Sequence, residues 1–308
     1  MLDLRFLVLS ALAFSGINNA QVDLGIASAF AVLAGTAVTN TGSSTTNGSV
    51  GVAPGTAITG FPPGTITNGA MHLADTDAFQ AQAYVAAAYA AAAGLPPNTD
   101  LSGQDLGGMT LGAGVYSFSS SAQLTGSLVL DGHGDPSSVW VFQIGSTLTT
   151  ASAASVLLIN GGSPCNVFWQ VGSSASVGAA TAFVGSVLAL ASIDAVTGSS
   201  FNGGLYARNG AVTLDTNNVL GGLACPTTAT CLYKQYTCGY NLVAARGYNN
   251  AELTAAANQT GPIPPLTTDE LLQVLYYCND TANHIVGNSF CIAGCIAMPF
   301  RYDDQCAM

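Results

Sequence analysis

The sequence predicts an all-β solenoid with one long flanking α-helix and a small disulfide-rich module at its C-terminus. Three observations support this fold class. Short apolar runs broken by Gly, Ser and Asn fill residues 103–222, which is typical of many short strands joined by tight turns. Related runs recur at a fixed spacing. Only 7% of the residues are charged, against roughly 25% in ordinary domains.

The spacing of the repeats predicts the shape of the solenoid. Three runs start at equal intervals, namely Trp169-Gln-Val-Gly, Val187-Leu-Ala-Leu and Leu205-Tyr-Ala-Arg. One turn of the solenoid earlier, Gln143-Ile-Gly precedes the matching run Gln170-Val-Gly by one and a half of these intervals. The extra half interval fits a loop around residues 161–165. A repeat of roughly 18 residues supplies three strands of about four residues plus turns, which is one triangular rung of a β-helix.

One segment interrupts the strands. Residues 75–93 contain no Gly or Pro and are dominated by Ala, the best helix former. Asp75 is the expected N-cap, and Gly94 and Pro96-Pro97 end the segment. Further short strands are expected in residues 29–68, before this helix. The helix is therefore expected to be an insertion within the solenoid that covers apolar strands and has no catalytic role.

The start of the chain, residues 1–20, is typical of a secretory signal peptide. Arg5 precedes the apolar run Phe6–Phe14, and a cleavage site follows Ala20. The expected organisation is a signal peptide at 1–20, a β-helix domain at 21–224 and a cystine-rich module at 225–308, in a secreted, extracellular protein. No later run is long enough to span a bilayer. A net charge of −11, with no Lys or Arg between Leu24 and Ala207, argues against nucleic acid and anionic lipid as partners.

Eight cysteines in an exported chain predict disulfides. They are Cys165, Cys225, Cys231, Cys238, Cys278, Cys291, Cys295 and Cys306. Since only the first lies in the solenoid, parity predicts that Cys165 pairs with Cys225, the nearest in sequence, and that three bridges form within the module. The alternatives to this pairing are a disulfide between Cys165 and another cysteine of the module, or a free thiol at Cys165.

The module offers two further features. A helix is expected at Thr268–Tyr277, with Thr268 as its N-cap. Three Asn-x-Ser/Thr sequences, at Asn47, Asn258 and Asn279, are candidate glycosylation sites in a secreted protein. The sequence leaves the role of the module open between a stability cap, an oligomerisation unit and a wall-binding unit.

Several motifs follow one another in a characteristic order. They are Gly48-Ser-Val-Gly-Val-Ala-Pro-Gly55, the Ala-rich helix, Asp105-Leu-Gly-Gly-Met-Thr-Leu-Gly-Ala-Gly-Val-Tyr116, Leu124-Thr-Gly-Ser-Leu-Val-Leu-Asp-Gly132, Val139-Trp-Val-Phe-Gln-Ile-Gly145 and Asn166-Val-Phe-Trp-Gln-Val-Gly172. Over residues 22–224 the chain resembles the microbial ice-binding protein family of fungi, bacteria and algae. The resemblance implies a right-handed triangular β-helix with irregular rung order, the helix alongside it, and no enzyme activity or cofactor. It also implies binding to ice through one flat face. The run Gly204-Leu-Tyr-Ala-Arg208 departs from the pattern, and the module lies outside it.

The strand after each repeated run is the candidate ice-binding face. Ice offers no charge to pair with, so a flat array of hydroxyls and methyls suits it, and Thr carries both on a side chain with restricted χ1. Leu148, Ala175, Ile193 and Val212 are expected to point inward, so their neighbours point outward. The predicted outward set is Thr147, Thr149, Ser174, Ser176, Ser192, Asp194, Ala211 and Thr213, with Gln123 and Thr125 around Leu124 as one more rung. A second face containing Val141, Gln143, Gln170 and Leu188 remains an alternative.

Two other classes of function are weaker. An enzyme on a β-helix needs clustered carboxylates, and the one close pair, Asp131 and Asp135, belongs to a turn with His133 that is better explained by turn formation than by a metal site. A secreted adhesive or glycan-binding protein is the runner-up, because Thr/Ser faces also suit glycans. Trp140 and Trp169 alternate within apolar strands and are expected in the core or packed against the helix, which favours ice.

Overall fold

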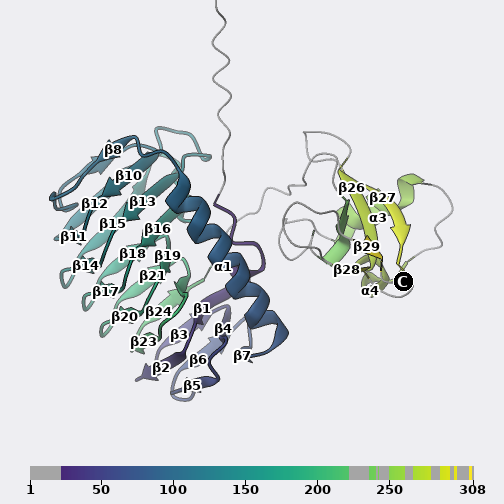
Figure 1. The fold of residues 1–308 in the computed structure, drawn as a ribbon, viewed down its shortest axis with the longest axis horizontal. Helices are drawn as coiled ribbons and strands as arrows, with labels where there is room; N and C mark the ends of the chain where they lie inside the picture. Colours follow the sequence, from purple (N-terminus) through teal and green to yellow (C-terminus); the bar gives the residue numbers. More distant parts are fainter. Residues whose placement is uncertain are drawn as a thin grey trace, which may run out of the picture.

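The computed structural model describes residues 22–221, 236–240, 242, 250–260, 266–278, 285–291, 295–296 and 305–306. The predicted signal peptide at 1–20 lies outside the described residues. From residue 22 to 221, three parallel sheets wrap into a triangular solenoid with one long helix along its side (Figure 1). The predicted fold class is confirmed, including the helix inserted between strands.

The three sheets are named here A, B and C, each in spatial order. Sheet A contains β7 (Met71–Leu73), β4 (Ser49–Val52), β1 (Phe30–Ala34), β22 (Leu205–Ala207), β19 (Ser186–Ala189), β16 (Val167–Val171), β13 (Trp140–Ile144), β10 (Gly114–Phe118) and β8 (Thr99–Asp100). Sheet B contains β11 (Ala122–Leu124), β14 (Leu148–Thr150), β17 (Ala175–Val177), β20 (Ile193–Ala195), β23 (Val212–Asp215), β2 (Ala37–Thr41) and β5 (Ala57–Thr59). Sheet C contains β6 (Thr65–Thr67), β3 (Thr45–Asn47), β24 (Asn218–Leu220), β21 (Ser200–Asn202), β18 (Ala182–Val184), β15 (Ser155–Ile159), β12 (Ser127–Asp131) and β9 (Thr110–Leu111).

The rungs do not stack in chain order. The first rung, β1 to β3, pairs with the last, β22 to β24, and with β4 to β6 on its other side. The chain therefore builds one end of the solenoid first, crosses to the opposite end, and returns rung by rung until it closes on its own beginning. This is the irregular rung order that the family resemblance implied.

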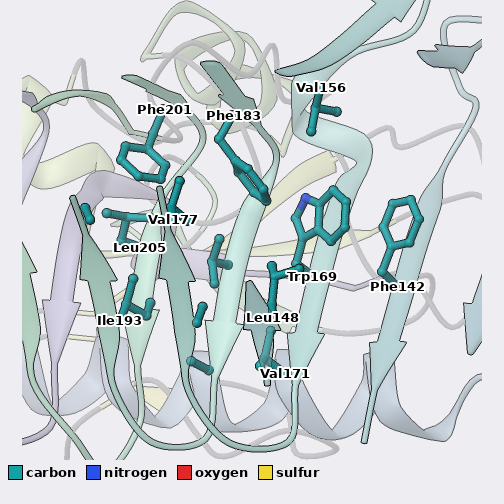
Figure 2. Packing of buried hydrophobic residues seen from close by; sticks show 14 of the residues in the cluster. Phe142, Leu148, Val156, Trp169, Val171, Val177, Phe183, Ile193, Phe201 and Leu205 are labelled. Atoms are coloured by element: carbon teal, nitrogen blue, oxygen red, sulfur yellow. The ribbon is translucent and has the colours of Figure 1, made fainter. Parts of the chain in front are cut away.

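A ladder of aromatic rings fills the solenoid interior (Figure 2). It runs through Tyr116, Phe142, Trp169, Phe183 and Phe201, with Phe142 and Trp169 stacked at 3.9 Å between ring centroids. The indole N–H of Trp169 donates to the carbonyl of Val184 at 2.9 Å, which satisfies the one polar atom that the ring buries. Trp140 and Trp169 are fully buried in this core, so of the two places expected for them the structure selects the core over packing against the helix.

The crossing from one end of the solenoid to the other is made by α1 (Thr76–Gly94). Asp75 caps it by accepting the N–H of Ala78 at 2.9 Å, as expected from the sequence. The helix has 19 residues, or about 28 Å at 1.5 Å per residue, which is close to six strand spacings of about 4.8 Å. Its small face is buried at Ala78, Ala81, Val85, Ala88 and Ala92.

That small face lies on the outer surface of sheet A. Val141, Phe168, Leu188 and Tyr206 point out of the sheet and are buried in one cluster with the helix. Tyr206, in the run that departs from the family pattern, donates its hydroxyl to the carbonyl of Phe30 at 3.0 Å. The alternative second face is thus largely occupied, because α1 covers it.

The described part of the C-terminal module contains β25 (Tyr236–Cys238), β26 (Val274–Cys278) and β27 (Ile285–Phe290) in an antiparallel sheet. The remaining elements of the module are α3 (Asn250–Ala257), a 3₁₀ turn (Asn258–Thr260), α4 (Thr268–Leu271), β28 (Cys295–Ile296) and β29 (Gln305–Cys306). In the solenoid, two further 3₁₀ turns precede β1 (Gly25–Ala29) and β16 (Pro164–Asn166). Disulfides join Cys238 to Cys295 and Cys291 to Cys306.

The prediction of a helix at Thr268–Tyr277 is wrong. Only one helical turn forms, and Thr267 rather than Thr268 caps it, in a capping box with Glu270. Residues 274–278 are instead the central strand of the antiparallel sheet. Val and Tyr favour a pleated, half-buried surface, and pairing on both sides outweighs the helical propensity of the preceding residues.

The cysteine predictions are answered in part. Cys165 is disulfide-bonded, which excludes the free thiol. Every other cysteine lies at residue 225 or later, so this disulfide joins the solenoid to the module. Cys225 and Cys231 lie outside the described residues, and the Cys165–Cys225 pairing therefore stays a prediction. Within the described ranges there is no helix long and apolar enough to cross a membrane.

Candidate functional site

The outer face of sheet B presents a straight row of side chains, one from each strand. Successive strands bring Gln123, Thr149, Ser176, Asp194 and Thr213 side by side in register. These residues are exposed, except for the half-buried Ser176, whereas the residues before them are buried in the core. Alternate residues of a strand point to opposite faces, so all five side chains share the outer face. We call this line of residues the central row.

The central row continues over two strands that the sequence analysis left out. Thr213 pairs with Thr39 on β2, and Thr39 pairs with Thr59 on β5. Both side chains are exposed. A signal was present, since Ala37-Val-Thr and Ala57-Ile-Thr repeat the tripeptide that starts at Ala211. Seven strands spaced by about 4.8 Å make the row about 29 Å long.

A second row of small residues precedes the central one. It consists of Ser121, Thr147, Ser174, Ser192, Ala211, Ala37 and Ala57. The hydroxyls of Ser121 and Thr147 bond each other at 2.7 Å. Ser174 and Ser192 each accept a backbone N–H from the next rung, at 3.3 and 3.2 Å. These bonds fix the rotamers of the second row and tie neighbouring rungs together at the corner of the solenoid.

The expected alignment of Thr125 is wrong. Ala122, not Leu124, lies opposite Leu148, and Leu124 lies opposite Thr150. Gln123 therefore belongs to the central row, while Thr125 follows the end of β11 at the other edge of the face. Its backbone N–H donates to the Oδ1 of Asp105 at 2.9 Å. The repeats predicted which residues of this strand point outward but missed the register by two positions.

Charge on the face is confined to carboxylates. Asp194 is exposed in the middle of the central row. Asp215, at the far edge, accepts hydrogen bonds from the hydroxyls of Thr197 and Thr216. The Thr197 hydroxyl is the main reason that the pKa of Asp215 lies below its ordinary value. No strand of sheet B contains Lys or Arg.

The turn at residues 131–135 is structural. Oδ1 of Asp131 accepts the backbone N–H of His133 at 2.9 Å and the amide of Asn160 at 2.8 Å. These two bonds, the N–H of His133 first, hold the pKa of Asp131 below its ordinary value. Asp135 accepts the N–H of Ser137 in the same way. The carboxylates thus form the turn, and the described part of the chain holds no cluster of three or more metal-ligating side chains.

Sheet C differs from sheet B in its outward side chains. Its outer face carries Val129, Leu157, Val184 and Leu220, which are bulky, apolar and at least partly exposed. Asn47 also lies on sheet C, where its Oδ1 accepts the amide of Asn68 at 2.8 Å. Asn258 is exposed in the module, and Asn279 lies outside the described residues. Sheet B is therefore the face whose continuous row of outward side chains contains no bulky apolar residue.

Comparison with known proteins gives a consistent picture. The model of the family described as Ice-binding-like matches residues 32–220. An ice-binding protein of Nostoc sp. (strain HG1) is 54% identical over 219 residues, which cover 69% of this chain and 81% of that protein. The crystal structure of an ice-binding protein from the Antarctic ascomycete Antarctomyces psychrotrophicus is 47% identical. The two structures match over 64% of this chain and 97% of the Antarctomyces chain, with a TM-score of 0.62.

A third comparison extends the range of the similarity. The structure of an ice-binding protein from an Arctic yeast, which is described as giving the structural basis of that protein's antifreeze activity, has a sequence 31% identical to this chain and a TM-score of 0.61. It covers 66% of this chain and 95% of that one. The solenoid architecture is thus shared with fungal proteins at widely different levels of sequence identity.

Proposed function

The chain belongs to the Ice-binding-like family, and from this premise we propose that it adsorbs to ice through the outer face of sheet B. The function of the protein is ice binding, with antifreeze activity. The proposal concerns the face, and one observation supports it most: the central row runs without interruption over all seven strands of sheet B. Sheet A is largely covered by α1, and sheet C carries uneven apolar side chains.

The chemistry of the face suits an uncharged crystalline surface. Thr39, Thr59, Thr149 and Thr213 each place a hydroxyl and a methyl on one rigid, β-branched side chain. Such groups lose little rotamer entropy on adsorption, whereas long charged side chains would lose up to about 2 kcal/mol each. Parallel ladders on both sides hold every strand except those at the ends, so the array keeps its shape when it meets ice.

We further propose that the protein acts outside the cell. The signal-like segment, with cleavage after Ala20, and the disulfide at Cys165 both suit export. Ice is then the partner, and no reaction is assigned to the chain. The solenoid at 21–224 carries the ice-binding function, and the module at 225–308 is a separate unit joined to it by the Cys165 disulfide.

Observation of single ice crystals in a nanolitre osmometer tests the function. The purified mature protein should shape crystals, arrest their growth within a temperature gap and inhibit recrystallisation. Disc-shaped crystals that grow without facets at tens of micromolar protein would contradict ice binding. Fluorescently labelled protein adds a direct readout, since it should concentrate on the crystal surface and remain there after the surrounding solution is exchanged.

A further inference from the structure

A hollow opens on sheet A beside the C-terminal end of α1. Its volume is about 370 Å³, which falls in the range of small-molecule sites, roughly 300–1,000 Å³. The side chains around it include Tyr89, Asp100, Ser117, Gln143 and Gln170. The hollow lies on a different face from the central row of sheet B.

Gln170 is the unusual residue of this hollow. It is 7% exposed, yet its side-chain amide has no hydrogen-bond partner among the described residues. In register on sheet A, Gln170 lies between Gln143 on one side and the fully buried Leu188 on the other. A buried polar group that opens into a hollow is the arrangement expected of a ligand-binding residue.

The groups around Gln170 are held in place by bonds that leave part of their capacity unused. Nε2 of Gln143 donates to the carbonyls of Ala92 and Leu95 at 2.8 and 2.7 Å, which satisfies the end of α1. Its Oε1 is then left as an acceptor. Oδ1 of Asp100 accepts the N–H of Ser102 at 2.9 Å, and a carboxylate can accept several hydrogen bonds at once. The hollow is thus preorganised for hydrogen bonding.

The chemistry of these groups indicates the class of ligand. Amides, a carboxylate and the hydroxyl of Ser117 complement a molecule whose own hydroxyls both donate and accept. Asp100 is the one charged residue around the hollow, so it repels anions, and a single carboxylate is too few for a divalent cation, which takes several oxygen ligands. A neutral polyhydroxylated ligand fits this combination.

An aromatic ring stands at the rim of the hollow. Tyr89 belongs to α1 and lines the opening. The guanidinium of Arg208 lies 5.2 Å from the centre of this ring, which holds the ring in place from one side. Because Tyr89 lines the hollow, its ring can offer an apolar surface to the C–H groups of a bound molecule.

We propose that this hollow is a binding site for a neutral saccharide, of about the size of a monosaccharide or the end of a glycan chain. Gln170 and Gln143 bind its hydroxyls, Asp100 accepts from one of them, and Tyr89 packs against the sugar ring. The site is independent of the ice-binding face. A protein with both surfaces holds a polysaccharide on one side while the other side contacts ice.

Nuclear magnetic resonance of the mature, ¹⁵N-labelled protein tests the site directly. Glucose, galactose and mannose are titrated singly to tens of millimolar, and glucuronate serves as the anionic comparison. At least one neutral sugar should shift the side-chain amide signals of Gln143 and Gln170, and glucuronate should bind more weakly. Asp100→Asn should reduce the difference in affinity between glucuronate and the neutral sugars, because it removes the negative charge of the site. Unchanged amide signals with all three neutral sugars would overturn the proposal.

Gln170→Leu is the matched variant. Leucine has a similar size, and its introduction removes no side-chain hydrogen bond seen among the described residues, so the variant should melt at about the same temperature. Its affinity for the sugar should fall about three- to tenfold, as expected for loss of one or two hydrogen bonds, while its ice activity should not change. Equal sugar affinity in Gln170→Leu would place binding elsewhere and refute the site. Ser176→Tyr supplies the converse control, since it should lose ice activity and keep sugar binding.

Discussion

A tyrosine in the central row of sheet B tests whether this face contacts ice. Asp194 is on the middle one of the seven strands, so Ser176 lies one strand from the centre and Thr149 two strands from it. Ser176→Tyr or Thr149→Tyr raises a ring several ångströms above a row of short side chains. Because neighbouring strands are about 4.8 Å apart, the ring keeps a flat crystal surface away from the residues on both sides.

The position of the ring sets the size of the effect. Because the neighbouring strand is also kept from the ice, Thr149→Tyr leaves four consecutive strands in contact, from β20 to β5, whereas Ser176→Tyr leaves three, from β23 to β5. The free energy of adsorption adds up over the strands that touch ice, so the affinity falls steeply as strands are lost. Both variants should lose most ice activity, and Ser176→Tyr should lose more. Neither points into the core, so the free energy of unfolding should change by about 0.5 kcal/mol or less.

Two controls separate the face from the fold. Leu148 precedes Thr149 on the same strand and is fully buried, so Leu148→Ala should cost about 2–5 kcal/mol through the cavity it leaves and keep the face intact. Ala182→Tyr adds the same bulk to an exposed position on sheet C and should keep full ice activity. Thermal melts and ice-growth measurements are made on all four variants. Full activity of the sheet B tyrosines would show that ice binds elsewhere, and unfolding of these variants but not of Leu148→Ala would show that the inward and outward positions are exchanged.

Three further predictions concern single features of the chain. Asp194→Thr should keep or raise ice activity, measured as the growth-arrest temperature gap, because it replaces the one carboxylate of the central row with a hydroxyl and a methyl; a large loss would give the carboxylate a role in ordering water. Cys165 should pair with Cys225 in non-reduced peptide maps. A Cys165 peptide linked to another cysteine would refute the pairing. A glycan at Asn47 should leave ice binding unchanged, since this residue lies on sheet C, and enzymatic removal that alters activity would contradict the assignment of the face to sheet B.

The sequence alone determined the alternation within each rung. The regular spacing of the repeats and the switch between apolar and small polar residues identified Leu148, Ile193 and Val212 as inward, and the structure buries all three. The helix and its N-cap at Asp75 were also predictable, because propensity and capping act within a few residues of one another. These features depend on local physics, which a single chain segment expresses by itself.

The tertiary structure decided which rungs are neighbours. Thr39 and Thr213 are adjacent in the central row although more than half of the chain separates them. No local pattern specifies such a pairing, since any rung with the same alternation can stack on any other. The register of β11 was likewise undetermined by alternation, because a shift of two positions keeps every side chain on its own face. Contacts with both neighbouring rungs select one register.

The same distinction explains the two features whose roles the sequence did not show. Residues 274–278 form a strand rather than a helix because β25 and β27 pair with both edges, and this packing outweighs a weak helical preference. In the sequence, Gln170 is one more outward residue of an apolar strand. Its position beside the end of α1, which only the tertiary structure shows, leaves it largely buried without a partner among the described residues. Local alternation determined which side chains face outward on each strand, and the stacking of distant segments decided which of those side chains lie together and which are covered.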